Sequence, residues 1–291
     1  MNTGFNRKLL RYSVNEKFFS RWTSQMAYVL GFAFADGNIY KTSLSWDIQK
    51  RDRNILEKIN KAFDSNYPIK EQRGISYRLR INNQILIKNA LSKGLLPKKS
   101  LRLSFPSIPN KCIRHFVRGY LDGDGWLVIR KKGNKIDLGF VCGNKSFLKN
   151  LSEKIYDSVE ISRKVREKNK VTPKGFKSKT FLLEYYSSNT VIVADWLYDN
   201  LNPSDIYLDR KYKKYLQIKE LSNYLKSGSK KIRVVQKKLQ KPLTDILNNL
   251  YRDKHLDGVQ IANILGVHSS SVYRWLEKTG IKYVTHRNNY G

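Results

Sequence analysis

Two short segments of the chain end in Asp-Gly after a run of small and apolar residues, and their aspartates are the first candidates for chemistry. Residues 29–37 have the sequence VLGFAFADG, and residues 117–125 have the sequence VRGYLDGDG. The final aspartates, Asp36 and Asp124, lie 88 positions apart. That spacing is typical of a duplicated structural unit, so an internal repeat is expected to relate the two aspartates.

Both segments are expected to form helices with one small-residue face. Gly31 and Ala35 are four positions apart and share a helix face, as do Gly119 and Gly123. Small residues let two helix backbones approach closely. Packed through these faces, the two helices would bring their terminal aspartates together.

A bound cation would stabilise such a pair of carboxylates. Each carboxylate would face the negative end of its own helix dipole and the like charge of the other. Two carboxylates with backbone carbonyls and water form the hard oxygen site that Mg²⁺ prefers. Beside a bound phosphodiester, that site indicates metal-assisted hydrolysis.

The composition indicates a polyanionic partner. The 291 residues include 56 Lys and Arg against 24 Asp and Glu, which gives a formal net charge of +32 and a pI near 10.0. Nucleic acid or an anionic membrane surface would attract such a chain. Apolar residues make up 40% and aromatic residues 12%, which is enough for a core and excludes a disordered basic tail.

Other classes of protein are excluded by what the sequence lacks. The longest apolar run, Ala27 to Ala35, has nine residues and is too short to cross a bilayer. The first residues lack the apolar core of a signal peptide. The two cysteines and four histidines follow neither a metal-ligand nor a disulfide pattern. We therefore expect no membrane partner and an intracellular location, whether cytoplasmic, phage-encoded or organellar.

The elements around the two segments also repeat. After the first segment, Leu44, Trp46 and Ile48 alternate with polar residues and predict a strand with one buried face. A similar pattern follows the second segment. Each half is therefore expected to contain a helix, two strands, a helix, two strands and a helix. The other predicted elements are helices at 52–63, 83–93, 146–159 and 189–201 and strands at 77–82, 135–140 and 180–186.

The polar faces of the predicted strands carry many basic side chains. In most proteins such a face is simply solvated. In a chain with this charge, it can instead contact the phosphates and base edges of DNA. The residues expected at this DNA-binding surface are Ser45, Asp47, Gln49, Arg78, Arg80, Arg130, Lys132 and Lys135.

The C-terminal residues predict a separate small all-α domain. A basic linker is expected at 224–241, which contains KSGSKK and few large apolar residues. In 242–291, apolar residues recur with helical spacing, Gly266 suits a tight turn, and Ser269 or Ser270 is expected to cap a third helix. This is the spacing of a helix-turn-helix. Its third helix would offer to a DNA major groove Ser270, Ser271, Tyr273, Arg274 and Lys278.

The two Asp-Gly segments resemble the paired LAGLIDADG motifs of homing endonucleases. The second segment matches well, whereas the first has Phe34 where the consensus has its first Asp, kept in the second as Asp122. The resemblance covers about residues 20–220 and implies an α+β fold, with two pseudo-symmetric αββαββα halves forming a DNA-binding saddle. The implied parts are a first half at 1–110, a second half at 111–223, the linker at 224–241 and the helix-turn-helix domain at 242–291.

The same resemblance implies the site and the activity. The family makes metal-dependent double-strand breaks in a long DNA target during intron homing, with 3′ overhangs, Mg²⁺ as cofactor and Mn²⁺ as a substitute. A member with two motifs acts as a monomer on double-stranded DNA. The implied metal ligands are Asp36 and Asp124 with the carbonyls of Ala35 and Gly123, and the implied catalytic lysines are Lys99 and Lys211, with Lys98 and Arg210 as neighbouring alternatives.

Two other functions remain open. A transcription regulator on a non-catalytic LAGLIDADG scaffold would also carry a helix-turn-helix, although it would have no reason to keep both Asp36 and Asp124. An intron RNA maturase would suit the basic charge. The predicted helix-turn-helix nevertheless favours duplex DNA, because the deep major groove of RNA does not admit a helix.

Overall fold

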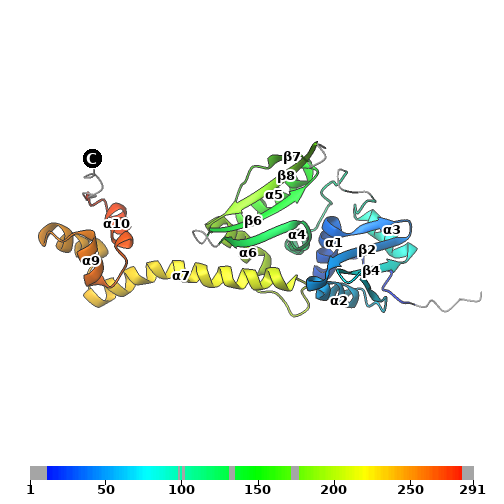
Figure 1. The fold of residues 1–291 in the computed structure, drawn as a ribbon, viewed down its shortest axis with the longest axis horizontal. Helices are drawn as coiled ribbons and strands as arrows, with labels where there is room; N and C mark the ends of the chain where they lie inside the picture. The colour runs from blue at the N-terminus through cyan, green and yellow to red at the C-terminus, as the bar shows by residue number, and fades with distance from the viewer. Residues whose placement is uncertain (1–11, 98, 100–101, 131–134, 172–176, 284–291) are drawn as a thin grey trace, which may run out of the picture. The chain divides into compact units, whose positions relative to one another are not determined.

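Both Asp-Gly segments are helical in the computed structural model, which describes residues 12–97, 99, 102–130, 135–171 and 177–283 (Figure 1). The chain divides into two units, Met1–Lys219 and Glu220–Gly291. No helix in the described part of the chain is long and apolar enough to span a membrane.

The first unit contains two halves with the same order of elements. The first half consists of α1 (Ser24–Asp36), β1 (Asn38–Tyr40), β2 (Ser43–Gln49), the 3-10 turn η1 (Lys50–Asp52), α2 (Arg53–Ala62), β3 (Ile69–Gln72), β4 (Ser76–Asn82) and α3 (Gln84–Ser92). The second consists of α4 (Asn110–Asp124), β5 (Gly125–Arg130), β6 (Lys135–Cys142), α5 (Lys145–Val159), β7 (Arg166–Val171), β8 (Lys177–Tyr186) and α6 (Ser188–Tyr198). The predicted repeat of helix, two strands, helix, two strands and helix is confirmed.

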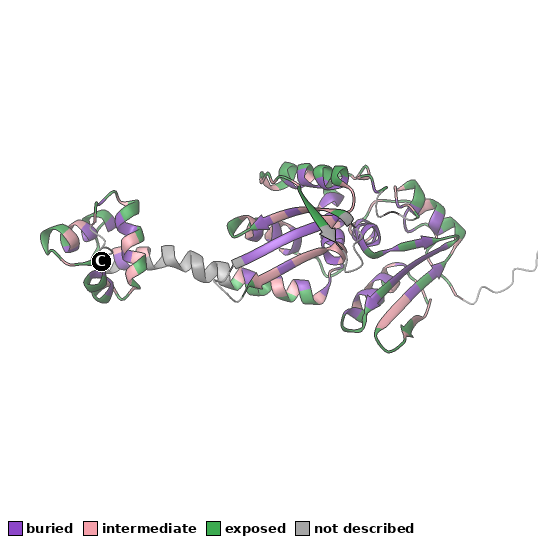
Figure 2. Cartoon of the chain, turned by 45° about the horizontal axis from the view of Figure 1, so that its top comes forward, coloured by how far each residue is buried: buried purple, intermediate pink, exposed green. Residues whose placement is uncertain are grey.

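Each half forms one antiparallel sheet of four strands with the same topology. The strand orders are β1-β2-β4-β3 and β5-β6-β8-β7. Leu44, Trp46 and Ile48 are buried, as their alternation predicts, and α2 and α3 contact the first sheet. In the second sheet, Leu138 and Leu183 are buried, and α5 and α6 contact the strands. Figure 2 shows the buried residues along the strands and on the inner sides of these helices.

The two halves meet through α1 and α4, which lie side by side between the sheets (Figure 1). A methyl group built on Gly31 would lie well under 3.0 Å from the backbone oxygen of Phe116, and one on Gly119 would meet that of Tyr28 equally closely. The two contacts correspond in the repeat, because Gly119 lies 88 positions after Gly31 and Phe116 lies 88 positions after Tyr28. The two helices therefore make the same backbone contact twice, and only glycine leaves room for it.

Helix α6 ends earlier than the sequence predicts. The sequence predicts a helix over 189–201, but α6 ends at Tyr198. Asp199 has extended backbone angles, and Asn200 has a φ of 50°. Asparagine tolerates this left-handed conformation better than most residues, so the chain turns there.

Helix α7 (Asp209–Leu239) contains the boundary between the units and most of the predicted linker. Residues 224–239 are helical, although the Gly-Ser sequence predicts an irregular linker. Lysine, leucine, arginine and glutamine are good helix formers, and they outweigh a single Gly228.

The second unit is a small cluster of helices. It contains α8 (Leu243–Asn248), a π-helical turn (Asn249–Asp253), α9 (Gly258–Leu265) and α10 (Ser269–Lys278). Leu247, Ile261 and Leu276 form part of its buried core. Gly266 ends α9 with the expected positive φ, 64°. The cap of α10 is His268, not a serine, because its imidazole accepts a hydrogen bond from the backbone N–H of Ser270.

Replacing Gly119 with alanine is expected to lower the free energy of unfolding of the first unit by about 2 kcal/mol, because the methyl group would force α1 and α4 apart. Urea unfolding of the full chain, followed by tryptophan fluorescence, would measure this. Lys111→Ala, an exposed change on α4, is the control and should alter stability by less than about 0.5 kcal/mol. Equal unfolding midpoints for Gly119→Ala and the wild type would contradict the close packing.

Candidate active site and nucleic-acid interface

Asp36 and Asp124 are the last residues of α1 and α4, and the packing of these helices brings them together. A methyl group built on Gly123 would lie 3.3 Å from Oδ2 of Asp36. Lost hydration among the surrounding protein atoms raises the pKa of Asp36, although the residue still reaches solvent. Burial and the neighbouring charge of Asp36 raise the pKa of Asp124 from 3.8 to about 6.

A lysine ammonium caps the C-terminal end of each of these helices. Nζ of Lys99 donates to the carbonyl oxygens of Ala35 at 2.6 Å and Gly37 at 2.7 Å. Nζ of Lys211 donates to three carbonyls at the end of α4. These belong to Leu121, Asp122 at 3.0 Å and Gly125 at 2.7 Å. A cation in this position satisfies unpaired carbonyls and the negative end of the helix dipole.

The two ammonium groups differ in their surroundings. Lys211 is only 2% exposed, and burial lowers its pKa to about 8, opposed by the charge of Asp122. A pKa of about 8 keeps Lys211 mainly protonated at neutral pH. Lys99 is less buried, and its pKa is also lowered by burial, opposed by the charges of Asp124 and Asp36.

The neighbours of these lysines are placed differently. Lys98 lies outside the described residues. Arg210 forms an ion pair with Asp52, with Nε at 2.8 Å and 3.1 Å from the two carboxylate oxygens. Asp52 is buried in η1 of the first half, so this pair joins the two halves. The role of Asp52 was not predicted from the sequence, because no local pattern marks a partner 158 positions away.

The site offers a divalent cation an open set of ligands. Within the described ranges, no group of three or more His, Cys, Asp or Glu side chains is placed to hold a metal ion. The protein ligands available are therefore the carboxylates of Asp36 and Asp124 with nearby backbone carbonyls. The carbonyl of Ala35 already accepts from Lys99. Other positions around an ion would be left to water or a substrate oxygen.

The first sheet brings five of the predicted DNA-contacting residues onto one face. The register of β2 and β4 places Ser45 opposite Arg80 and Asp47 opposite Arg78, away from the core. Gln49 and Arg80 are exposed. Asp47 and Arg78 form an ion pair, and Ser45 is buried between its neighbours.

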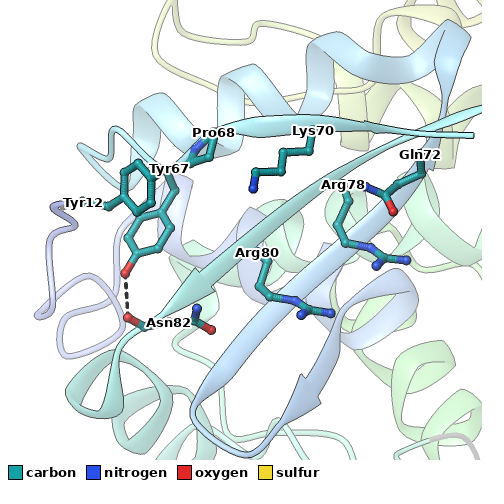
Figure 3. Close-up of a pocket in the computed structure, with 8 residues that line it drawn as sticks. All are labelled: Tyr12, Tyr67, Pro68, Lys70, Gln72, Arg78, Arg80 and Asn82. Atoms are coloured by element: carbon teal, nitrogen blue, oxygen red, sulfur yellow. Dashed lines mark hydrogen bonds between the residues drawn. The ribbon is translucent and has the colours of Figure 1, made fainter. Parts of the chain in front are cut away.

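A hollow of about 270 Å³ opens on this face (Figure 3). The rings of Tyr12 and Tyr67 lie at one end, with centroids 5.1 Å apart, and Lys70, Arg78 and Arg80 lie along the strands beside them. The other residues around the hollow are Pro68, Gln72 and Asn82. The contribution of β3 was not predicted from the sequence, because its four residues show no alternation of polar and apolar side chains.

Of the DNA-contacting residues predicted in the second sheet, only Arg130 has a described side chain. Arg130, at the end of β5, is exposed and forms an ion pair with the buried Asp137 of β6. Lys135 pairs with Arg130 in the register of β5 and β6 and is described by its backbone only. Lys132 lies outside the described residues.

Helix α10 carries the residues predicted for a major groove. On its surface, exposed or half-buried, are Ser270, Ser271, Arg274 and Lys278. Tyr273 is packed within the unit. A methyl group built on Gly258 would lie well under 3.0 Å from the Tyr273 ring, and the ring of Tyr283 is 5.3 Å away. Tyr273 is nevertheless only half-buried, like Ser271, so part of its ring remains accessible.

No family model matches this chain, and no curated protein matches its sequence. Solved structures similar to it include LAGLIDADG homing endonucleases with DNA. The I-LtrWI endonuclease bound to target DNA has 12% identity and a TM-score of 0.44, covering 73% of this chain and 92% of its own. I-WcaI bound to its DNA recognition sequence has 16% identity and a TM-score of 0.41, covering 73% and 95%.

Another similar structure is the N-terminal LAGLIDADG domain of DUF199/WhiA. It has 11% identity and a TM-score of 0.41, covering 65% of this chain and 91% of its own. At these identities and scores, similarity alone decides nothing about activity. The function has to be inferred from the side chains at the site.

Asp124→Asn is expected to stabilise the metal-free protein in a pH-dependent way. The folded state keeps the Asp124 proton up to about pH 6, whereas the unfolded chain loses it near 3.8, so stability falls as the pH rises between these values. The variant should therefore gain about 2 kcal/mol at pH 7.5, and less at pH 4.5. Urea unfolding in EDTA at both pH values would measure this gain.

The control for this experiment is Asp64→Asn, a change at an exposed aspartate. It should show no comparable dependence on pH. A loss of stability in Asp124→Asn at pH 7.5, or an equal gain at both pH values, would contradict the unfavourable ionisation of Asp124.

Proposed function

We propose that this chain is a divalent-metal-dependent endonuclease that hydrolyses both strands of duplex DNA at a long, specific site. The meeting of Asp36 and Asp124 at the ends of two repeated helices, each with a lysine ammonium beside it, carries this proposal. A merely structural interface gains nothing from two close carboxylates at helix C-termini. Because both sites come from one chain, we propose that it acts as a monomer.

The residues at the site fit a magnesium ion. Mg²⁺ is usually held by one or two carboxylates together with waters and substrate phosphates, and Asp36 and Asp124 supply the carboxylates. Burial raises the pKa of both groups even though Lys99 and Lys211 stand nearby, so their ionised forms are poorly solvated and a bound cation would stabilise them. We propose the carbonyls of Ala35 and Gly123 as additional ligands and Mn²⁺ as a substitute. A bound ion would polarise the scissile phosphate and acidify a water molecule.

The chain's own residues then have separate roles in hydrolysis. A water oxygen forms a bond to phosphorus, and the bond from phosphorus to one sugar oxygen breaks. The attacking water loses a proton to solvent, and the leaving sugar oxygen takes up a proton from solvent. Asp36 and Asp124 hold the negative charge that fixes the cation site. Lys99 and Lys211 place an ammonium charge where it can balance the charge developing on the phosphate oxygens. From the resemblance of the motifs, we propose that the two cuts leave 3′ overhangs.

Two surfaces are proposed to bind the DNA. The open faces of the sheets, with Arg80 and the hollow beside it, would contact phosphates and base edges. The second unit would bind as a helix-turn-helix, with α10 in the major groove. Tethering makes its binding intramolecular, so that even a weak contact adds affinity. The formal net charge of +32 supports both contacts.

The rival function is a DNA-binding regulator that does not cut. One observation favours it, namely that the ammonium groups of Lys99 and Lys211 already donate to backbone carbonyls, as purely structural helix caps would. A regulator would keep the same DNA-binding surfaces and lose only the chemistry. Cleavage, and not binding, therefore separates the two functions.

Asp36→Asn and Asp124→Asn are each expected to abolish double-strand cleavage and to leave specific binding largely intact, because asparagine keeps the shape and removes the charge. The substrate is a DNA fragment that spans the gene, its flanks and the uninterrupted form of the same locus. The wild type should give discrete cuts with Mg²⁺ and none with EDTA. Gel electrophoresis of the products and a parallel binding assay would show both effects.

Asp64→Asn again serves as the matched control and should cut like the wild type. Cleavage by Asp36→Asn or Asp124→Asn at the wild-type rate would refute the assignment of the site. Specific binding by the wild type, without cuts in Mg²⁺ or Mn²⁺, would favour the regulator.

The double variant Arg274→Ala/Lys278→Ala is expected to weaken DNA binding by about tenfold and to lower the salt dependence by about two ions, because each exposed cation of α10 that contacts a phosphate releases a counterion. Cleavage at saturating protein should be unchanged. Arg252→Ala/Lys254→Ala removes the same charge from exposed positions outside α10. Equal losses in the two double variants would mean that net charge, and not α10, determines the binding of this unit.

A further inference from the structure

Asp122 is a carboxylate that the proposed chemistry does not use. It is 2% exposed and lies two positions before Asp124. Its carboxylate accepts three hydrogen bonds from three different elements. The donors are the hydroxyl of Tyr28 at 2.7 Å, the hydroxyl of Tyr198 at 2.6 Å and the backbone N–H of Leu208 at 2.8 Å. A buried carboxylate with this many partners holds those elements in place.

The bond to Leu208 leads directly to Lys211. The carbonyl of Leu208 accepts from the backbone N–H of Lys211 at 3.0 Å, in the first turn of α7. Nζ of Lys211 returns to the backbone carbonyl of Asp122 at 3.0 Å. These three hydrogen bonds form a closed circuit. It runs from the side chain of Asp122 through Leu208 and Lys211 back to the backbone of Asp122. The position of the ammonium depends on that circuit.

The first half has no such circuit. At the 88-position offset of the repeat, Phe34 takes the place of Asp122, and Phe116 takes the place of Tyr28. These two rings pack edge to face, with centroids 5.3 Å apart. An apolar contact thus replaces the hydrogen-bonded one. Lys99 makes its two bonds to carbonyls without a buried carboxylate at the equivalent position.

Other contacts hold the same segment from the first half. Nζ of Lys58 donates to the carbonyl of Tyr207 at 3.0 Å, and Arg210 forms its ion pair with Asp52. These contacts do not involve Asp122. A change at Asp122 would therefore shift the turn that carries Lys211 without detaching α7 from the rest of the unit.

We propose that Asp122 is a positioning residue for Lys211, and that it makes the two active sites unequal. The inference rests on the proposed endonuclease function. Asp122 touches neither the substrate nor the cation in this arrangement. It acts through Leu208 on the ammonium of the second site only. Cleavage of the DNA strand at the Lys211 site therefore depends on Asp122, whereas cleavage of the DNA strand at the Lys99 site does not.

Strand-resolved cleavage by Asp122→Asn tests this inference. One carboxylate oxygen accepts from Tyr28 and Leu208 and the other accepts from Tyr198. Asparagine keeps the size of the side chain but loses the charge and replaces one acceptor oxygen with an NH2 donor, so the three bonds are not all kept at full strength. We expect one strand to be cut about tenfold or more slowly, with the other unchanged, since small displacements of catalytic groups have effects of this size. The substrate is a supercoiled plasmid carrying the locus fragment used above, in Mg²⁺, with primer extension on each strand. Nicked circles should accumulate.

Tyr28→Phe is the matched control, because it removes one donor to the same carboxylate and leaves the Leu208 bond. It should keep the ratio of the two strand rates close to that of the wild type. The same strand bias in Tyr28→Phe as in Asp122→Asn would overturn the route through Leu208. A simple loss of folded protein would slow both strands together, so the ratio of rates separates positioning from stability.

The remaining outcomes are distinguishable. If Asp122→Asn slows both strands equally, or neither, the positioning role is overturned and the endonuclease function stands. If the wild type cuts neither strand of the plasmid in Mg²⁺ or Mn²⁺, the endonuclease function is overturned, and the positioning role falls with it.

Discussion

The backbone contact between α1 and α4 is the constraint on which the rest of the first unit depends. Gly31 and Gly119 leave space for the carbonyls of Phe116 and Tyr28, so the helices approach more closely than any side chain would allow. Because the contact is made twice, it fixes both the distance and the relative register of the helices. Their C-terminal ends then meet, and a strand of each sheet begins within two residues of that point. The site and the orientation of the sheets follow from one interface.

The same interface creates an electrostatic conflict, which the lysines only partly relieve. Two carboxylates at helix C-termini oppose the helix dipoles and each other. Burial raises the pKa of both, and the neighbouring charge of Asp36 raises that of Asp124 further. The ammonium groups of Lys99 and Lys211 hydrogen-bond to backbone carbonyls. Their positive charges lower the pKa of both carboxyl groups and so offset part of the effect of burial. The fold thus carries a local cost that makes sense if an ion and a phosphate belong there.

Much of this could be predicted from the sequence, because the signals are local or repeated. The small-residue spacing predicts the contact of α1 and α4, and the alternation around Trp46 predicts a half-buried strand. Lys99 and Lys211 could be suggested only through resemblance to a family, since nothing local marks them. The partners of Asp52 and Asp122 were not predicted, because Arg210 and Leu208 lie 158 and 86 positions away from them in the chain. Such pairings appear only when the halves are assembled.

In the C-terminal unit, some features that are local in the sequence could still not be predicted from it. Gly266 could be predicted as a turn residue, because a positive φ is a property of one residue and its two neighbours. The cap of α10 and the packing of Tyr273 depend on competition among several suitable side chains, which the sequence alone does not resolve. The helical course of 224–239 depends likewise on summed propensities outweighing one glycine.

Because both halves lie in one chain, a substitution in one half is not repeated in the other. In a symmetric homodimer, every substitution appears in both subunits, and a bound DNA site tends to mirror that symmetry as a palindrome. Here the pair Phe34 and Phe116 corresponds in the repeat to the pair Asp122 and Tyr28, so an apolar contact replaces a hydrogen bond. The open faces of the two sheets also carry different residues. Each half can therefore change without its counterpart. Under the proposed function, the DNA sequence that this chain recognises has no physical reason to be palindromic.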